Sequence, residues 1–207
     1  MVYKFEEISN DLMDYFILGD PELLLQFKNS RNLPDDLITE FTTQPTIDEA
    51  VEQGVLIPMC GVENHPYNIY FNFDDSSIFS KQENQLQHRQ DGYCLHITNE
   101  IVCFYTMPSL RTFTAEQIQR LKDNRLTSWD VLLMKKCPTP SIALQNGWYS
   151  VSVLAGLVLD EGYYEPAFEF LINPSEKKPN YTANYSYRFS VNSSLGLSQK
   201  LMPFPNN

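Results

Sequence analysis

Apolar residues recur with a helical period in the first quarter of the chain and with a strand period after Gly54. The early pattern predicts four short helices, over about residues 11–18, 22–30, 34–41 and 46–53. Asn10 or Asp11 can cap the first helix, which we expect to end at Gly19. Asp20-Pro21 gives the second helix a capping residue followed by a proline in the first turn. Thr46, with Glu49 three residues later, has the spacing of a capping box for the fourth.

After Gly54 the chain becomes rich in aromatic and β-branched residues, which favour strands. A short strand over residues 55–57 is interrupted by Pro58. Apolar and polar side chains alternate strictly over residues 67–73, which predicts a strand with one buried face. The residues that follow, Asp74-Asp75-Ser76-Ser77, are typical of a turn that ends the strand. Further strands are predicted over residues 93–97, 101–106, 148–154, 167–172 and 185–191.

Two of these strands, 93–97 and 101–106, predict a hairpin around Thr98-Asn99-Glu100. A two-residue loop would place Cys94 opposite Cys103, and a three-residue loop would offset them. In either register the simpler interpretation is two small buried side chains, because free cysteine is usually a core residue. The strands over 148–154 and 167–172 are joined by the acidic loop Asp160-Glu161-Gly162.

One helix is predicted among the strands, from Thr114 as its cap, with Gln117 at the third position, to about Asn124. The order of elements differs from the βαβα alternation of a parallel α/β fold. The sequence therefore predicts an α+β fold in which acidic N-terminal helices pack on a mainly antiparallel β core with one inserted helix. We expect one unit made of an acidic helical segment, a β-rich core and a polar tail, at residues 1–53, 54–191 and 192–207.

The charge of the protein is concentrated in that first segment. Residues 1–53 hold twelve of the 26 acidic residues and three basic ones, Lys4, Lys28 and Arg31, which gives −9 of a total formal charge of −11. The remaining 154 residues carry 14 acidic and 12 basic side chains. A charge confined in this way can steer a basic partner toward one face. It disfavours binding to nucleic acid or to an anionic membrane, both of which require a basic surface.

Composition indicates a folded protein in a reducing compartment. The apolar fraction of 43% is enough for a core, and no apolar stretch is long enough to span a bilayer. The N-terminus lacks a basic start followed by an apolar run, so we expect no signal peptide. The four cysteines form no CxxC pair and no zinc spacing, and we expect reduced thiols in the cytoplasm.

One polar-aromatic stretch, residues 60–67, is a candidate for chemistry. Glu63 and His65 could act as a base and its orienter, or could bind a metal with help from His88 or His96. The alternative is a buried turn, in which a glycine allows the bend and His65 is held by hydrogen bonds. The spacing matches no metal-binding or hydrolase motif, so Glu63, His65 and His96 are a candidate polar site without an assigned reaction.

Motifs for other chemistry are missing. The eight glycines form no phosphate-binding loop, and neither a GxSxG elbow nor an HExxH zinc motif is present. Asp74 and Asp75 are adjacent, so in a strand they would point to opposite sides, and turn formation explains them better. Cys94 and His96 share a strand face, which is a weak indication of a nucleophilic cysteine. We expect no catalytic residue, no cofactor and no metal.

Two stretches of the chain resemble a group of uncharacterised bacterial proteins. They are GVENHPYNIYFN at residues 61–72 and GWYSVSVLAG at 147–156, with EPAFEF downstream at 165–170. The resemblance spans roughly residues 54–172 and leaves the acidic first quarter outside. In size and acidity such proteins are similar to the immunity partners of secreted bacterial toxins, which implies a binding role and no catalytic residue.

The charge, the missing motifs and this resemblance together predict a cytosolic bacterial binding protein, an immunity protein that occludes a basic cognate toxin. Acidic side chains would steer the encounter and exposed aromatic ones would supply binding energy. The predicted contacts are Asp11, Asp14, Asp35, Asp36 and Glu40. The alternative for these residues is that they are only the hydrated faces of helices, or that they face the basic residues Arg111, Arg120, Lys122 and Arg125 of the inserted helix.

Two other functions stay open at the level of the sequence. One is a small hydrolase or metal-dependent enzyme centred on Glu63, His65 and His96, which requires these side chains to converge in a cleft. The other is a structural or regulatory homodimer built through a sheet edge.

Overall fold

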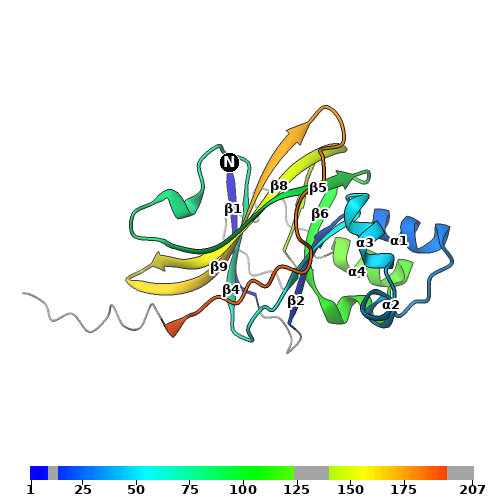
Figure 1. Cartoon of the computed structure of the whole chain (residues 1–207), viewed down its shortest axis with the longest axis horizontal. Coiled ribbons are helices and arrows are strands. Elements are labelled where there is room, and N and C mark those ends of the chain that lie inside the picture. The colour runs from blue at the N-terminus through cyan, green and yellow to red at the C-terminus, as the bar shows by residue number, and fades with distance from the viewer. Residues whose placement is uncertain (9–13, 124–139, 195–207) are drawn as a thin grey trace, which may run out of the picture.

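Two β-sheets pack against each other, and helices cover the outer face of the smaller one at one end of the molecule (Figure 1). The computed structural model describes residues 1–8, 14–123 and 140–194. Sheet A contains, in spatial order, β1 (Val2–Ile8), β4 (Tyr67–Asn72), β9 (Tyr163–Ser175), β8 (Gly147–Asp160) and β5 (Gln85–Ile97). Sheet B contains β3 (Leu56–Cys60), β2 (Tyr15–Gly19), β6 (Ile101–Thr106) and β7 (Ser141–Ala143). Every neighbouring pair is antiparallel except β4 with β9, which confirms the α+β class.

The helices begin close to where their capping residues predict. The Asp20 side chain caps α1 (Pro21–Ser30), and the Thr114 hydroxyl accepts a hydrogen bond from the Gln117 backbone N–H at the start of α4 (Ala115–Asp123). The helix α2 (Leu37–Thr43) begins three residues later than Pro34, because the Asp36 carboxylate caps it. The helix α3 (Thr46–Glu52) has no side-chain cap, so the predicted capping box is not formed. The 3₁₀ turns are η1 (Ile78–Ser80) and η2 (Met107–Leu110).

The predicted first helix is wrong, because residues 15–19 form strand β2 in the middle of sheet B. Phe16, Ile17 and Leu18 are a run of three apolar residues and are all buried, as expected for a strand covered on both faces. Gly19 ends this strand rather than a helix, and a Cβ there would lie 2.9 Å from the carbonyl oxygen of Val55. The proposed caps Asn10 and Asp11 lie outside the described residues. The acidic segment therefore begins with strands in both sheets.

The predicted hairpin over residues 93–106 is also wrong. β5 pairs with β8 in sheet A, whereas β6 pairs with β2 and β7 in sheet B, so the turn at Thr98 and Asn99 carries the chain from one sheet to the other. Cys94 lies opposite Ser150, and Cys103 lies opposite Gly19 and Ser141, so neither predicted register occurs. Both thiols are buried, as expected for core cysteines. The pairing with β8 extends along most of β5, so it stabilises this strand more than a local hairpin with β6 would.

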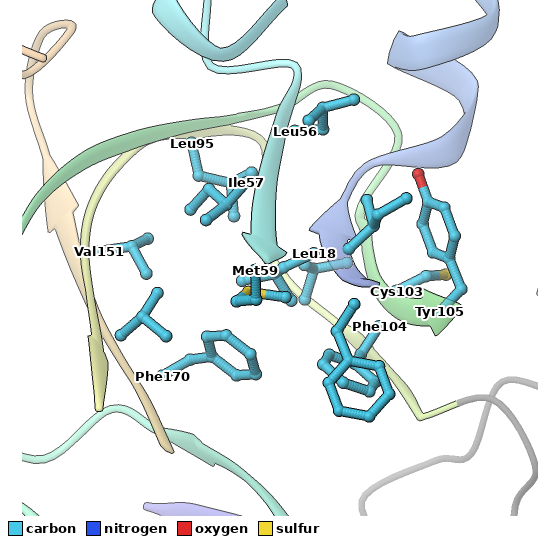
Figure 2. Close-up of a cluster of buried hydrophobic side chains, with 14 of the residues drawn as sticks. Leu18, Leu56, Ile57, Met59, Leu95, Cys103, Phe104, Tyr105, Val151 and Phe170 are labelled. Carbon is cyan, nitrogen blue, oxygen red and sulfur yellow. The ribbon is translucent and has the colours of Figure 1, made fainter. Parts of the chain in front are cut away.

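The core between the sheets is largely aromatic. Phe16 packs edge-to-face on Phe168 at 5.6 Å and on Tyr67 at 5.4 Å between ring centroids. In Figure 2, Ile57 and Met59 of β3 point toward Val151 and Phe170 of sheet A, while Leu56 points the other way. Sheet B is thus buried on both faces, against sheet A on the inside and against the helices on the outside.

The outer face of sheet A is covered by the loop that contains η1. The buried Glu169 carboxylate accepts hydrogen bonds from Asn72 Nδ2 at 2.6 Å and from the Ile78 backbone N–H at 2.8 Å, and Ser77 donates a further one. A small apolar cluster around Tyr70 and Phe79 lies beside it. The alternating pattern predicts that only one face of β4 is buried. All six residues of β4 are buried, because the loop with η1 covers the other face.

Residues 176–194 cross the open side of the two sheets as a strap, drawn in orange to red in Figure 1. The predicted strand over 185–191 is wrong, since this stretch makes a single bridge between Arg188 and Cys60. The Phe189 N–H donates to the Cys60 carbonyl of β3 at 2.8 Å, and the Thr182 N–H donates to the Gly92 carbonyl of β5 at 2.9 Å. Phe189 is fully buried, so the strap closes the core between an edge of each sheet.

The buried Asp20 carboxylate joins the helices to the turn between the sheets. It accepts hydrogen bonds from the backbone N–H groups of Glu22 and Leu23 at the start of α1. It also accepts the backbone N–H groups of Thr98 and Asn99, at 2.9 and 3.0 Å, and the side chains of the same two residues. A buried charge is stable only when its hydrogen bonds are made, and here six donor groups are satisfied by one side chain.

We expect Asp20→Ala to destabilise the protein by about 3 kcal/mol or more, because it removes a cap and leaves buried donors unpaired. Urea unfolding at neutral pH, followed by circular dichroism, measures the loss. The matched control is Asp36→Ala, which removes a cap of the same kind at a half-buried position and should lower stability less. An equal loss in the two variants would contradict the junction role of Asp20.

Candidate functional site

The acidic residues of α2, α3 and the preceding loop form the candidate site, which we call the acidic helical face. It contains Asp35, Asp36, Glu40, Asp48, Glu49 and Glu52, all of which are exposed or half-buried. The helices themselves are held by their apolar sides, since Leu37, Phe41, Ala50 and Val51 are buried in the core. The acidic side chains therefore point away from sheet B.

Two residues of the acidic helical face are paired with cations of α1 and the residue that follows it. Lys28, whose side chain is 9% exposed, forms an ion pair with Asp35 at 2.5 Å. The Arg31 guanidinium forms a two-point contact with Glu49, with Nε 2.9 Å from Oε2, and lies 3.9 Å over the Phe27 ring. Arg31 holds the pKa of Glu49 below its usual range. Asp35 and Glu49 are thus largely neutralised within the molecule.

Asp36 and Glu40 make hydrogen bonds to neutral groups instead. The Asp36 carboxylate accepts from the Thr39 hydroxyl at 2.8 Å and from the backbone N–H groups of Ile38 and Thr39. These bonds, the Thr39 hydroxyl first, keep the pKa of Asp36 below its ordinary value. Glu40 accepts from the Thr46 hydroxyl at 2.5 Å, which ties α2 to α3. Hydrogen bonds therefore hold both carboxylates in a fixed orientation.

Within the described residues, Asp36, Glu40, Asp48 and Glu52 form no salt bridge. Arg111, of the predicted basic cluster, contributes a small part of the lowering of the Asp36 pKa. Arg120 pairs with Glu116 on its own helix. Arg125 and the side chain of Lys122 are outside the described residues. The described part of the basic cluster therefore leaves most of the acidic helical face open to a partner.

A small apolar pocket lies between the outer face of sheet B and the helices. Its floor is formed by Ile17, Leu56 and Pro58, and its walls by Phe41 of α2, Ile47 of α3 and Met107 of η2. We call it the helix-sheet pocket. Its cavity volume is about 20 Å³, which is room for about one water molecule. The sequence gives no sign of it, because its lining residues come from five separate elements.

The other predicted contacts lie apart from this pocket or outside the description. Asp14 is exposed directly before β2, and its carbonyl oxygen accepts the Val62 N–H at 3.2 Å. Asp11 is outside the described residues, so its role stays a prediction.

Glu63 and His65 lie in one turn, as the sequence suggests, and both are used in packing. Glu63 accepts a hydrogen bond from the Ser190 hydroxyl of the strap at 2.7 Å. The His65 ring packs on Tyr67 at 4.5 Å, and its buried Nε2 has no hydrogen-bond partner. Burial lowers the pKa of His65, so the imidazole is neutral at physiological pH. This arrangement resembles the predicted buried turn, although hydrogen bonds do not hold the ring.

His96 is not brought to Glu63 and His65. His96 lies opposite Trp148 of β8. Asn68, three residues after His65, pairs with Ala167 of β9, and Ala167 pairs in turn with Gly156 of β8. Trp148 and Gly156 are eight residues apart, which is about 26 Å along the strand. The His96 ring stacks on Trp148 at 4.1 Å and 5°, and Gly54 is required beside it, because a Cβ there would lie 2.8 Å from the indole.

The described residues hold no group of three or more histidine, cysteine or acidic side chains able to bind a metal. Burial raises the pKa of the Cys60 and Cys94 thiols, which keeps them protonated and weakly nucleophilic. Among the helices described, none has the length and apolar character needed to cross a bilayer.

No family model and no curated protein matches the chain. Among solved structures, the chain is similar to that of ComJ from Bacillus subtilis, described as an inhibitor of the DNA degrading activity of NucA. The two chains are 14% identical, and the similarity covers 84% of this chain and 96% of that chain with a TM-score of 0.41. The inhibition is a property of ComJ. The resemblance of the two sequence stretches to uncharacterised bacterial proteins stays a prediction.

The stack of His96 on Trp148 predicts a pH-dependent fluorescence signal. Burial lowers the pKa of His96, so we expect the protonation midpoint in the folded protein to fall below about 6.5. Because the unfolded chain then binds more protons, stability should decrease as pH falls below about 6.5. In a Trp129→Phe background, protonation of His96 should quench Trp148 emission, and His96→Gln should remove the transition. A midpoint above 6.5 would rule out the buried stack.

Proposed function

We propose that this chain is a bacterial cytoplasmic immunity protein that binds a basic, cognate secreted toxin through the acidic helical face and neutralises it. The observation that carries the proposal is the set of carboxylates on α2 and α3 that form no salt bridge in the described residues. A solvated carboxylate that lacks a cation partner attracts a basic surface over a distance of about 8–10 Å at physiological salt.

The pairing pattern refines the choice of contact residues. Asp35 and Glu49 are neutralised by Lys28 and Arg31, so they contribute little to the field. Hydrogen bonds to neutral groups fix the positions of Asp36 and Glu40. Fixed carboxylates lose less conformational freedom on binding than mobile ones, which favours association. Asp48 and Glu52, which the sequence analysis does not single out, join them as contacts.

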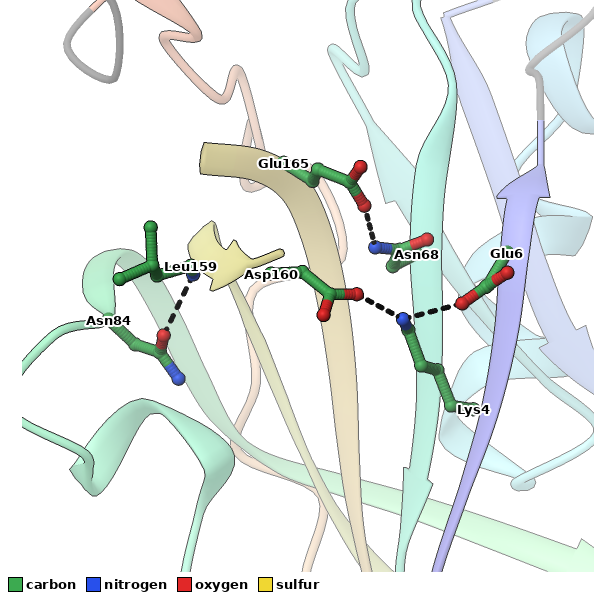
Figure 3. Close-up of polar contacts among 7 residues, drawn as sticks. All are labelled: Lys4, Glu6, Asn68, Asn84, Leu159, Asp160 and Glu165. Atoms are coloured by element: carbon green, nitrogen blue, oxygen red, sulfur yellow. Dashed lines mark hydrogen bonds and ion pairs between the residues drawn. The ribbon is translucent and has the colours of Figure 1, made fainter. Parts of the chain in front are cut away.

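The homodimer alternative has less support. β1 is an edge strand of sheet A, and Figure 3 shows Lys4 near the middle of it between Glu6 and Asp160. Lys4 donates hydrogen bonds to both, at 2.6 and 2.5 Å. Charged side chains on an edge strand discourage pairing with a second copy. The enzyme alternative requires Glu63, His65 and His96 to converge, and they lie at different ends of sheet A.

The test is a charge reversal of Glu40, Asp48 and Glu52 to lysine. Wild type and variant are used to capture proteins from a lysate of the native host, and association with the captured basic protein is measured by surface plasmon resonance. We expect the reversal to slow association by about tenfold or more at low salt and to flatten its salt dependence. Co-expression with that protein should restore growth for the wild type and not for the variant.

The matched control reverses Asp75, Glu83 and Glu161, which are exposed and belong to loops of sheet A. It changes the net charge equally, so it separates local steering from the charge of the whole molecule. Thermal unfolding confirms that both variants are folded. An association rate that is unchanged in the first variant, or reduced equally in both, would refute the proposed role of the acidic helical face.

A further inference from the structure

We propose that a polar groove between η2 and α4 binds a small phosphate monoester, and that Arg111 holds its phosphoryl group. We call it the arginine groove, because Arg111 and Arg120 both line it. The inference goes beyond the proposed function and does not rest on it, since the acidic helical face belongs to α2, α3 and the loop before them.

The arginine groove is large enough for a small organic molecule. Its cavity volume is about 430 Å³. Binding sites for small molecules usually have volumes of about 300–1,000 Å³. A phosphate ion alone would leave most of this space to water, so the volume favours a phosphoryl group that carries an organic part. Arg111, Thr112 and Arg120 are exposed, so a ligand can reach the groove from solvent.

Buried residues hold both walls of the groove. Leu110 and Phe113, on either side of Arg111 in the chain, belong to the hydrophobic core. The Phe113 N–H donates to the Asp35 carbonyl oxygen at 2.8 Å. On the other wall, the buried Ile118 holds α4 to the same core. The backbone around the groove is therefore positioned by core packing, and the groove is formed before a ligand binds.

Arg111 supplies the positive charge for an anion. Its side chain is exposed and forms no salt bridge within the residues that the structure describes. It is the smallest of the causes that lower the pKa of Asp36, so it interacts with that carboxylate only weakly. Arg120 pairs with Glu116, four residues earlier on α4, and both line the groove. The groove thus presents one guanidinium to an anion, with an ion pair beside it.

The hydroxyl groups in the lining favour a phosphoryl group over a carboxylate. Ser109, Thr112 and Thr114 all line the groove, and each carries a hydroxyl that can donate a hydrogen bond. The Thr114 hydroxyl accepts the Gln117 N–H at 3.4 Å, which leaves its own hydrogen for a ligand. A guanidinium binds two oxygens of a carboxylate or a phosphate side by side. A phosphate monoester has a third oxygen, which these hydroxyls can bind.

The ion pair of Arg120 with Glu116 selects the rest of the ligand. The Glu116 carboxylate repels a second anionic group, so a single phosphoryl group is favoured over several. Hydroxyl groups can both donate to this carboxylate and accept from the Arg120 guanidinium. The chemistry of the lining therefore fits a sugar phosphate with one phosphoryl group.

A titration with ribose 5-phosphate, followed by NMR of the backbone amides, tests this site. Ribose and inorganic phosphate are the reference ligands. At 0.15 M salt, acidic charges more than about 8 Å from the groove are largely screened. We expect ribose 5-phosphate to bind about tenfold more tightly than either reference, because charge-assisted hydrogen bonds and the organic part both contribute. The amide signals of Thr112 and Gln117 should shift. The signal of Gly162 should not, because the turn between β8 and β9 lies at the opposite end of the molecule from α4 (Figure 1).

Arg111→Gln should weaken the binding of ribose 5-phosphate about tenfold or more and leave the binding of ribose unchanged. The matched control is Arg89→Gln, which removes an exposed arginine of β5 that pairs with Asp91, and it should leave both affinities unchanged. Arg111→Lys keeps the charge and loses the two-point contact, so it should bind with an intermediate affinity. Thermal unfolding checks that all three variants are folded, as expected for substitutions at exposed positions.

Equal affinity for ribose 5-phosphate and ribose would overturn the proposal, because the groove would then recognise no anion. Equal affinity for ribose 5-phosphate and inorganic phosphate would overturn the assignment of an organic phosphate. A loss in Arg89→Gln as large as that in Arg111→Gln would attribute binding to net charge and refute the role of the groove. None of these results bears on the proposed function, since its capture and growth assays depend on the side chains of α2 and α3.

Discussion

The Asp20 carboxylate is the interaction on which the arrangement of helices and sheets depends. It caps α1 and at the same time binds the turn at Thr98 and Asn99, where the chain passes from sheet A to sheet B. Because one buried side chain satisfies both, the start of α1 is fixed relative to both sheets. The two short helices that follow then lie over the outer face of sheet B. The position of the acidic helical face is thus set at a point that is itself fully buried.

The same arrangement combines a rigid surface with an exposed charge. β2 and β3 have one face in the core and the other under the helices, so the floor of the helix-sheet pocket is a product of core packing. The charges around it are added by α2 and α3, whose apolar sides hold them to the sheet. In the proposed function, stability and recognition are therefore supplied by opposite faces of the same elements, and a substitution on the solvent-exposed face would alter binding with little effect on folding.

Local signals in the sequence predict local structure well. Asp20 before Pro21 marks a helix start, and Glu161-Gly162, both with positive φ, forms the turn between β8 and β9. The failures come from long-range pairing: Phe16–Leu18 suits a helix or a buried strand until β3 and β6 are placed beside it. The acidic side chains of the site are visible in the sequence. Their partners are not, because Lys28 meets Asp35 and Arg31 meets Glu49 only after the helices fold together.

The strap has a consequence for the order in which the protein can be completed during synthesis. The central pairing of β4 with β9 joins Asn68 to Ala167, so sheet A lacks its middle until most of the chain has been made. Phe189 then covers Phe168 from the last described stretch, with ring centroids 5.7 Å apart. A nascent chain exposes this aromatic core until Phe189 has left the ribosome, and contacts so distant in sequence form slowly. The acidic helical face is synthesised before β9, so it precedes the strand that completes sheet A on the far side of the core.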